Sequence, residues 1–429
     1  MASSAHPDRA TIESAQLEQL RSLVAELIPA NKFYTQKLQA VGVGFDVASL
    51  ADFSARFPFT TKAELVADQQ AHPPYGTNLT YPLDRYTRFH QTSGTSGHPM
   101  RWLDTPESWD AMIESWSEVF QAAEVKAGDR VMFAFSFGPF LGFWLAFESA
   151  ERLGCLCLPG GGLSSAARLR MMRDNHATVL CCTPTYAMRL AEVAATEHIE
   201  IATLGINTIV VAGEPGGSIP ATRTKLESLW PGARIFDHHG MTEVGPVTHE
   251  CPAQPGVLHV IESAYFAEII DPVTSKPAPS GELILTTLTR TGSPLLRYRT
   301  GDLVRCEVGS PQCVCGRSSL RLAGGILGRV DDMVIVRGVN VYPSAVEEIL
   351  RRFADVAEYQ VHCTTAAPLA ELRIEVESTD RCIDVVGLKN NVRQALETAF
   401  NLRIPVETVA PGSLPRFEMK AKRWRRDSH

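Results

Sequence analysis

A short run rich in hydroxyl groups and glycines occupies residues 91–99, with the sequence Gln-Thr-Ser-Gly-Thr-Ser-Gly-His-Pro. Hydroxyls donate hydrogen bonds, and glycines let backbone N–H groups approach a ligand closely, so this loop has the groups needed to wrap a polyphosphate. Runs of the same composition are also common as solvated turns. The loop therefore indicates a phosphate site only in combination with other motifs.

Four further polar blocks follow the loop in chain order. Residues 237–243 (DHHGMTE) come directly after an apolar segment, and polar groups at the carboxyl end of a strand lie where α/β folds bind their ligands. Residues 297–303 contain Asp302, and residues 327–343 contain Arg329 and Asp331. Residues 414–423 bring Lys420 and Lys422 almost to the end of the chain. Five blocks in a fixed order are a far more specific signal than any one block.

Strands and helices alternate between the first and second of these blocks. The opening segment, residues 11–39, has apolar residues at helical spacing. Apolar runs predict strands at residues 131–135, 155–158, 178–182, 209–211 and 234–236. Helical patterns fall at residues 105–123, 164–174 and 184–195, and residues 137–150 are expected to form an aromatic helix or turn. Such alternation favours a parallel sheet covered by helices on both faces. Shorter alternating strands at residues 266–305 predict a small β subdomain.

A glycine-rich stretch at residues 323–328 precedes about a hundred further residues with their own helix and strands. A chain of 429 residues is also too long for one compact core. We therefore predict an α/β protein with two domains. Residues 1–328 form a large N-terminal domain of helix-covered parallel sheets and a β subdomain, and residues 329–429 form a small mobile α+β domain.

The overall charge and the first residues of the chain bear on the expected partners and location of the protein. A formal net charge of -7 offers no basic field for nucleic acid or an anionic membrane, although a short basic cluster lies at residues 420–426. The first residues are polar, without the apolar core of a secretory signal, and we expect no membrane span and a cytoplasmic location. Ten cysteines in such a protein are expected to be reduced thiols or, in part, metal ligands.

With these motifs in this order, the chain resembles the adenylate-forming superfamily of acyl-CoA ligases, luciferases and nonribosomal adenylation domains. Within it, the chain is similar to the phenylacetate-CoA ligase family, also at residues 31–38 (NKFYTQKL) and 58–65 (PFTTKAEL). The resemblance implies an enzyme that converts an aromatic acid and ATP into an aryl adenylate and pyrophosphate, and then transfers the aryl group to coenzyme A. Phenylacetate, benzoate, hydroxybenzoates and anthranilate all remain open as the acid.

The resemblance also implies a role for each block. Thr242 would contact the α-phosphate, Glu243 would hold Mg²⁺, and Asp302 would accept hydrogen bonds from the ribose hydroxyls. Lys420, with Lys422 as its competitor, would stabilise the transition state as catalytic lysine. Asp331 would be the hinge about which the small domain turns. The implied nucleotide-binding residues are Thr92, Ser93, Gly94, Thr95, Ser96, Gly97, Ala212, Gly213, Glu214, Asp237, His238, His239, Gly240, Met241, Asp302 and Arg329.

Two positions depart from the usual family pattern. His98 stands where the phosphate loop commonly ends in lysine, so a permanent positive charge is lost and turnover is expected to be slower or more sensitive to pH. His239 stands where an aromatic residue commonly stacks on adenine. An imidazole still offers a flat face, so we expect nucleotide binding to survive.

The pocket for the acid and a metal site are the remaining expectations. Aromatic residues crowd residues 133–144, and most of them are expected to be core. The predicted substrate-binding residues are Phe135, Phe140, Gly213, Gly240 and Pro246. Cys251, His259, Cys313 and Cys315 flank the β subdomain and have the donor types of a tetrahedral structural Zn²⁺ site. Reduced thiols without metal, with His249 or Cys306 as other participants, are the competing interpretation.

Other functions share the same residues. An enzyme that loads the phosphopantetheine of a carrier protein would perform the same first half-reaction. A catalytically silent sensor of acyl nucleotides is a more distant alternative, which the presence of Glu243, Asp302 and Lys420 argues against. The resemblance also leads us to expect a homodimer.

Overall fold

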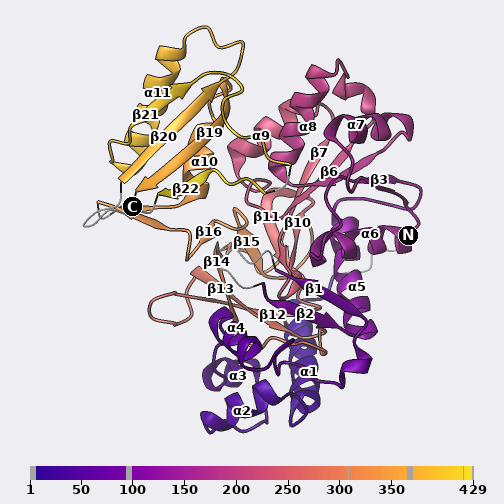
Figure 1. Ribbon diagram of the computed structural model, residues 1–429. Helices are drawn as coiled ribbons and strands as arrows, with labels where there is room; N and C mark the ends of the chain where they lie inside the picture. Colours follow the sequence, from indigo (N-terminus) through magenta and orange to yellow (C-terminus); the bar gives the residue numbers. More distant parts are fainter. Residues whose placement is uncertain are drawn as a thin grey trace.

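The computed structural model describes residues 6–92, 99–307, 309–337, 339–364, 371–418 and 420–427. Four helices form the base of the large domain, the indigo part of Figure 1: α1 (Arg9–Leu27), α2 (Lys32–Ala40), α3 (Leu50–Arg56) and α4 (Lys62–Ala71). Thr61 and Glu64 form a capping box, in which each side chain binds the backbone N–H of the other residue. This box makes α4 begin at Lys62, a residue that reaches the candidate active site.

A five-stranded parallel sheet forms the upper part of the large domain. Its strands are β3 (Arg130–Phe133), β4 (Leu156–Pro159), β5 (Val179–Cys182), β6 (Thr208–Ala212) and β7 (Arg234–His238), in the order β4-β3-β5-β6-β7. The predicted alternation of strands and helices is confirmed.

Helices cover both faces of this sheet. Along β5, Val179 and Cys181 pack against α5 (Pro106–Ala122) and α6 (Leu141–Leu153). The intervening residues, Leu180 and Cys182, pack against α7 (Ser165–Asp174), α8 (Pro184–Thr196) and α9 (Pro220–Leu229). Because successive side chains of a strand point to opposite faces, a strand buried on both sides must be apolar throughout.

The β subdomain lies between the helical base and the parallel sheet (Figure 1). One antiparallel sheet contains β10 (Thr248–Cys251), β11 (Gln254–Val260) and β15 (Arg321–Ala323). A second contains β12 (Tyr265–Ile270), β13 (Ser280–Thr287), β14 (Tyr298–Arg305) and β16 (Gly328–Arg329). Two hairpins carry site loops: β1 (Arg88–Gln91) with β2 (Arg101–Asp104), and β8 (Gly240–Met241) with β9 (Gly245–Pro246). Two short 3-10 helices, η1 (Leu83–Arg85) and η2 (Ile201–Leu204), complete the large domain.

The small domain has its own apolar core. It contains the hairpin β17 (Val334–Val336) and β18 (Val339–Val341), the helices α10 (Pro343–Arg351) and α11 (Val385–Phe400), and a four-stranded sheet. The sheet is ordered β21 (Val406–Val409), β20 (Glu371–Ser378), β19 (Val356–Thr364), β22 (Trp424–Asp427). Gly328 and Arg329 pair with β14, so the sheet of the large domain reaches past residue 328, and the strands of the small domain begin at Val334.

Within the described ranges, no helix is both long and apolar enough to cross a membrane. The basic cluster near the chain end is partly explained by internal pairing. Arg423 is buried and forms ion pairs with Glu358 at 2.6 Å and Glu347 at 3.4 Å. The following strand, β22, joins the small-domain sheet as a parallel edge strand beside β19.

Candidate active site

Two of the predicted motifs lie side by side at the carboxyl edge of the parallel sheet. Ala212 at the end of β6 is paired in register with His238 at the end of β7. The buried Asp237 accepts a hydrogen bond from Ser218 Oγ at 2.5 Å and another from the backbone N–H of His238. Gly217 allows this packing, because a Cβ there would lie 2.6 Å from the Asp237 carboxyl carbon. The sheet edge thus brings the residue 212–214 and 237–239 segments together.

Asp302 is held from both sides at this edge. Its Oδ1 accepts a hydrogen bond from Arg329 Nη1 at 2.9 Å, and its Oδ2 lies 3.0 Å from His239 Nε2. The pairing of β14 with β16 sets Asp302 directly opposite Arg329, which also contacts Asp331 at 2.9 Å. Burial acts to lower the pKa of Arg329, but the carboxylates of Asp302 and Asp331 outweigh it and raise that pKa. The 237–243 block, the β subdomain and the segment of the predicted hinge therefore meet at the Asp302 carboxylate.

Thr242 and Glu243 lie in the turn between β8 and β9. Lys62 Nζ donates to Glu243 Oε1 at 3.1 Å, and Glu243 Oε2 accepts no hydrogen bond from the described residues. Arg290 Nη1 donates to the backbone carbonyls of Thr242 at 2.9 Å and of Glu243 at 2.8 Å. Sequence reasoning missed both cations. Lys62 lies in the 58–65 motif, where it received no role, and Arg290 lies in no recognisable pattern.

Arg290 is itself held by a buried partner. Its guanidinium makes two parallel hydrogen bonds to Asp104, at 2.6 and 2.8 Å, and the two side chains are almost completely buried. The guanidinium carbon also lies 5.3 Å from the centre of the Trp102 ring. Asp104 ends β2, so this ion pair connects the β1–β2 hairpin to the turn that carries Thr242 and Glu243.

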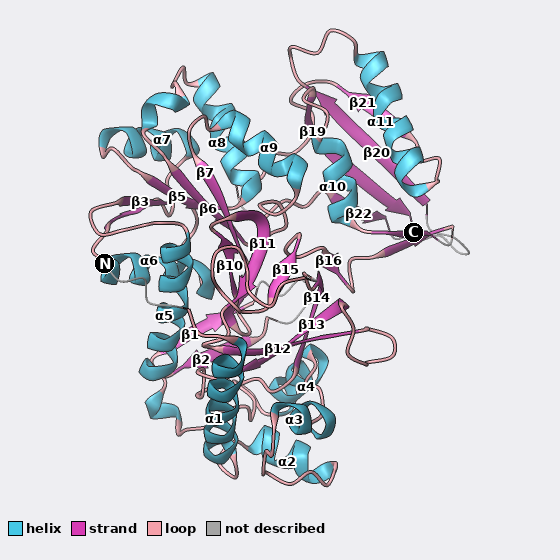
Figure 2. Cartoon of the chain, turned by 180° about the vertical axis from the view of Figure 1, so that it is seen from behind, coloured by secondary structure: helices cyan, strands magenta, loops and turns pink. Residues whose placement is uncertain are grey.

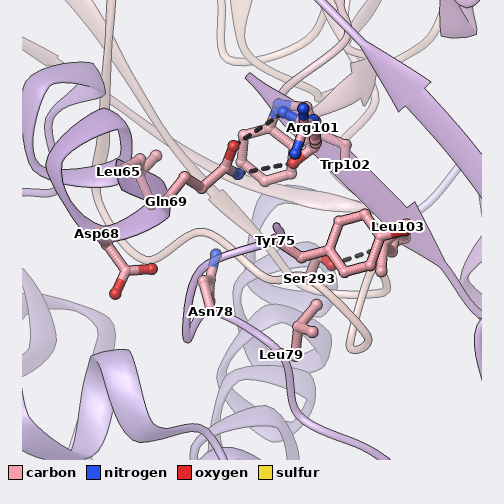
Figure 3. Close-up of a pocket in the computed structure, with 10 residues that line it drawn as sticks. All are labelled: Leu65, Asp68, Gln69, Tyr75, Asn78, Leu79, Arg101, Trp102, Leu103 and Ser293. Atoms are coloured by element: carbon pink, nitrogen blue, oxygen red, sulfur yellow. Dashed lines mark hydrogen bonds between the residues drawn. The ribbon is translucent and has the colours of Figure 1, made fainter. Parts of the chain in front are cut away.

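Trp102 also borders a small pocket, whose lining includes none of the predicted site residues (Figure 3). Gln69 on α4 closes one side, because its amide exchanges hydrogen bonds with the backbone of Arg101 at 2.7 and 3.0 Å. The pocket has room for about one water molecule. The lining residues are Leu65, Asp68, Gln69, Tyr75, Asn78, Leu79, Arg101, Trp102, Leu103 and Ser293.

We predict that Arg290→Met destabilises the large domain by about 3–5 kcal/mol, because it leaves the Asp104 carboxylate buried without a partner. Arg85→Met is the matched control: Arg85 pairs with Glu107 at 3.0 Å on the exposed surface, where such pairs contribute about 0–1 kcal/mol. Urea unfolding followed by tryptophan fluorescence measures both changes. Equal urea midpoints for the two variants would show that the buried ion pair contributes no more to the free energy of unfolding than the exposed pair does.

Lys420 from the small domain lies beside the first of these motifs. A Cβ on Gly213 would lie 3.5 Å from Lys420 Cε. Glu214 connects the domains, since its carboxylate accepts from the backbone N–H of Thr185 at 2.9 Å and of Ala421 at 2.8 Å. Desolvation in the cleft lowers the pKa of Lys420, although Glu214 and Glu243 act in the opposite direction. Both Lys420 and Lys422 are exposed and form no hydrogen bond or ion pair with the described residues, so the approach to Gly213 and the nearby carboxylates are what distinguish Lys420.

Further polar contacts join the two domains. Arg416 bridges Glu192 on α8 at 3.2 Å and Glu377 on β20 at 2.5 Å. The backbone N–H of Ala221 on α9 donates to Glu348 on α10 at 2.9 Å. Figure 2 shows α10 facing α9 across this boundary. An interface built from ion pairs and single hydrogen bonds separates more readily than an apolar core.

Of the residues predicted to bind the acid, one belongs to the apolar cluster that includes α5 and α6. Phe135 is buried within it, and Phe140 precedes α6 and is half-buried. Gly240 and Pro246 pair across the β8–β9 hairpin. Beside them lies the buried His238, whose ring centre is 4.3 Å from that of Trp116.

The tautomer of His238 follows from its contacts. Burial lowers its pKa to about 3, so the ring is neutral. His238 Nδ1 lies 2.6 Å from the Thr248 carbonyl oxygen, which only accepts, so Nδ1 carries the proton and Nε2 is an acceptor. A Cβ on Gly240 would lie 3.2 Å from that Nε2, and none of the described residues donates to it. His238 therefore presents a hydrogen-bond acceptor beside Gly240, one of the residues predicted to bind the acid.

The phosphate loop falls mostly outside the described residues. Residues 93–98, which include the predicted Ser93, Gly94, Thr95, Ser96 and Gly97 and the unusual His98, are not described. Thr92 is described, and it exchanges hydrogen bonds with the backbone of Met100 at 2.9 and 3.0 Å. The β1–β2 hairpin thus holds the two ends of the loop together.

The cysteines and histidine proposed as metal ligands also come together. The ligand atoms of Cys251, His259, Cys313 and Cys315 all lie within 4.8 Å of one another. His249 and Cys306 lie outside this group.

Comparison with known proteins agrees with the fold and the motifs. The AMP-binding enzyme family model matches residues 87–285, and the AMP-binding enzyme C-terminal domain matches residues 338–426. The phenylacetate-coenzyme A ligase of Thermus thermophilus is 31% identical, over 96% of this chain and 95% of the relative. The enzyme of the same name from Pseudomonas putida is 30% identical, over 95% of this chain and 92% of the relative.

A solved structure of 2-hydroxyisobutyryl-CoA ligase in the postadenylation state has a TM-score of 0.93 and 28% identity, covering 99% of this chain and 91% of that one. Against the same ligase in the thioesterification state, at the same coverage, the TM-score is 0.74. The similarity in sequence spans both domains of the curated relatives. The chain therefore belongs to the phenylacetate-coenzyme A ligase family of AMP-binding enzymes.

Proposed function

We propose that this protein is an AMP-forming ligase that joins an aromatic carboxylic acid to coenzyme A through an aryl adenylate. The observation that carries the proposal is the convergence of Glu243 and Asp302 on Lys420: both carboxylates lie close enough to influence its pKa, and its side chain lies beside Gly213. The near full-length identity with phenylacetate-coenzyme A ligases supports the same activity.

The first half-reaction uses the groups at the sheet edge. Adenine binds against residues 212–214 and the His239 ring, and the ribose hydroxyls donate to Asp302. Thr242 Oγ1 donates to the α-phosphate. The Lys420 ammonium bridges the acid carboxylate and the α-phosphate, where negative charge develops during attack on phosphorus. Lys62 adds a second positive charge near the phosphates, because it already pairs with Glu243.

The donor set also fits a magnesium ion. Mg²⁺ prefers carboxylate and phosphate oxygens, and the Glu243 carboxylate has one oxygen that accepts no hydrogen bond from the described residues. The ion would neutralise negative charge on the phosphates. The phosphate loop, with Thr92 at its described end, would hold the β- and γ-phosphates.

The second half-reaction requires Lys420 to leave the cleft. We propose that the small domain rotates about Asp331, which stands between β16 and β17. The Arg416–Glu192 ion pair between the domains can break without exposing an apolar core, and Arg416 can keep its pair with Glu377 inside the small domain. The lower TM-score against the thioesterification state of the same ligase supports such a rotation, because the present arrangement is closer to the postadenylation state.

The deciding experiment measures AMP release with a panel of aromatic acids, ATP and Mg²⁺, with free coenzyme A or a phosphopantetheinylated carrier protein as acceptor. Release that requires both the acid and coenzyme A supports the ligase. Release with the carrier protein alone would support the alternative enzyme that loads a carrier. Absence of acid-dependent pyrophosphate exchange would overturn both and favour the sensor.

Two further properties belong to this proposal. We expect the enzyme to act in the cytoplasm, where ATP and coenzyme A are its small-molecule partners. We also expect a homodimer, which light scattering after size-exclusion chromatography tests.

The acceptor at His238 Nε2 favours acids whose ring carries a hydroxyl or amino group. We predict that His238→Leu lowers kcat/KM for a hydroxybenzoate or anthranilate by about 10–100-fold, the cost of one lost hydrogen bond in a buried pocket. Benzoate and phenylacetate, which lack a ring donor, are the internal control and should change little with the same variant. An equal loss for substituted and unsubstituted acids would contradict the preference.

A further inference from the structure

The β subdomain contains a compact group of metal-binding side chains outside the nucleotide site. We propose that Cys251, His259, Cys313 and Cys315 bind one structural Zn²⁺. Cys251 Sγ lies 3.6 Å from Cys313 Sγ, and Cys315 Sγ lies 3.4 Å from His259 Nε2. A tetrahedral zinc ion with three sulfur ligands and one nitrogen ligand separates its donor atoms by about 3.5–3.8 Å. These two donor pairs are close to this spacing, and all four donor atoms lie within 4.8 Å of one another.

A disulfide or a set of unliganded thiols fits this geometry less well than a metal ion does. A disulfide requires sulfur atoms about 2.05 Å apart, which the Cys251 and Cys313 sulfurs are not. Unliganded thiols would account for separate buried cysteines, as at Cys181 and Cys182, which lie on neighbouring positions of one strand. Such thiols give no reason for three sulfurs and an imidazole from three segments to bring their donor atoms within 4.8 Å of one another.

The surroundings of the group orient its donors. His259 Nδ1 lies 2.9 Å from Ser319 Oγ, which leaves Nε2 for the ion, as is usual for histidines that bind metals. Cys313 and Cys315 lie in a tight turn, in which the Gly316 N–H donates to the Cys313 carbonyl at 2.8 Å. Gly316 has a φ of +88°, a conformation that favours glycine, and it lets the turn present both thiols to one side.

The site also stabilises the nucleotide motif. Cys251 ends β10, and the same strand receives hydrogen bonds from the backbone of residues 237 and 239: the Asp237 N–H donates to Glu250 at 2.8 Å, and the His239 N–H donates to Thr248 Oγ1 at 3.0 Å. A metal at Cys251 would fix the end of this strand against the 313–315 turn. This positioning role rests on the proposed function of the motif. With four protein ligands the ion has no open position, so its role is structural.

Metal content tests the site without reference to activity. The full chain, purified without a polyhistidine tag from zinc-supplemented cells, should contain about one zinc per chain by mass spectrometry. Cys251→Ser and Cys315→Ser should lose it, whereas Cys306→Ser should keep it, because Cys306 is a half-buried thiol of the same subdomain outside the group. Wild-type protein without zinc, or equal zinc in all variants, would overturn the proposal even if the ligase activity is confirmed.

A second measurement uses the wild-type protein and so does not depend on the variants folding. Replacing zinc with Co²⁺ should give the intense visible absorption of a tetrahedral thiolate site. Removing the metal with a chelator should lower the first thermal unfolding transition by at least ~5 °C, and Zn²⁺ but not Mg²⁺ should restore it. The Kd for ATP should rise in parallel. An unchanged Kd in the metal-free protein would overturn the positioning role.

Discussion

Replacing Lys420 with alanine should slow formation of the aryl adenylate by about 10²–10³-fold, the usual effect of removing one group that stabilises charge in a transition state. The side chain reaches the Gly213 backbone, and the carboxylates of Glu214 and Glu243 lie close enough to influence its pKa. Its neighbour Lys422 is exposed as well and likewise forms no hydrogen bond or ion pair with the described residues, so the approach to Gly213 and the nearby carboxylates are what set Lys420 apart. Lys422→Ala is therefore the matched control and should keep a rate close to wild type.

Two assays separate the half-reactions. Acid-dependent pyrophosphate exchange reports the first one and should show the full loss in Lys420→Ala. Thioester formation from a synthetic aryl adenylate and coenzyme A reports the second one, and it should be nearly unchanged, because Lys420 has left the cleft in the rotated arrangement. A larger loss in Lys422→Ala, or equal losses in both assays for Lys420→Ala, would contradict the assignment.

The parallel sheet could be predicted from the sequence because its strands are buried on both faces. A segment such as residues 178–182 is apolar at every position but its first, so the local sequence alone reveals it, and β5 falls within one residue of the predicted bounds. The start of a helix could also be predicted from the residues next to it. Thr105 accepts a hydrogen bond from the Ser108 N–H and is followed by a proline, which makes α5 begin at Pro106.

The supports of the site could not be predicted in this way, because they are contacts between distant segments. Arg290 lies 186 residues from Asp104, and neither residue belongs to a repeating pattern. Glu214 accepts a hydrogen bond from the backbone N–H of Ala421, 207 residues away. Almost every residue has such an N–H, so the type of residue 421 does not indicate the contact. Such pairs depend on how the β subdomain and the small domain pack, which residue types and spacing do not specify.

His239 shows the same limit at a residue that the sequence did identify. Its type indicated a flat ring for adenine. The contact of its Nε2 with Asp302 at 3.0 Å depends on how β14 packs against the segment that follows β7. Ribose hydroxyls that bind Asp302 must therefore share its oxygens with, or displace, Arg329 and His239.

Replacing Asp302 with alanine should lower kcat/KM for ATP by about 10²–10⁴-fold, because two hydrogen bonds to an ionised carboxylate contribute about 1.5–3 kcal/mol each. Part of any loss would come from Arg329 and His239, which both depend on this carboxylate for position. The variant alone therefore does not separate ribose binding from support of the site.

A nucleotide that lacks one ribose hydroxyl separates them. Wild-type protein should use 2′-deoxy-ATP about 10-fold less efficiently than ATP, since one charged hydrogen bond is missing. Asp302→Ala should use the two nucleotides almost equally, because the group that distinguishes them is gone, as a double-mutant cycle requires. If the variant still prefers ATP by the wild-type factor, the ribose binds elsewhere and Asp302 only holds Arg329 and His239 in place.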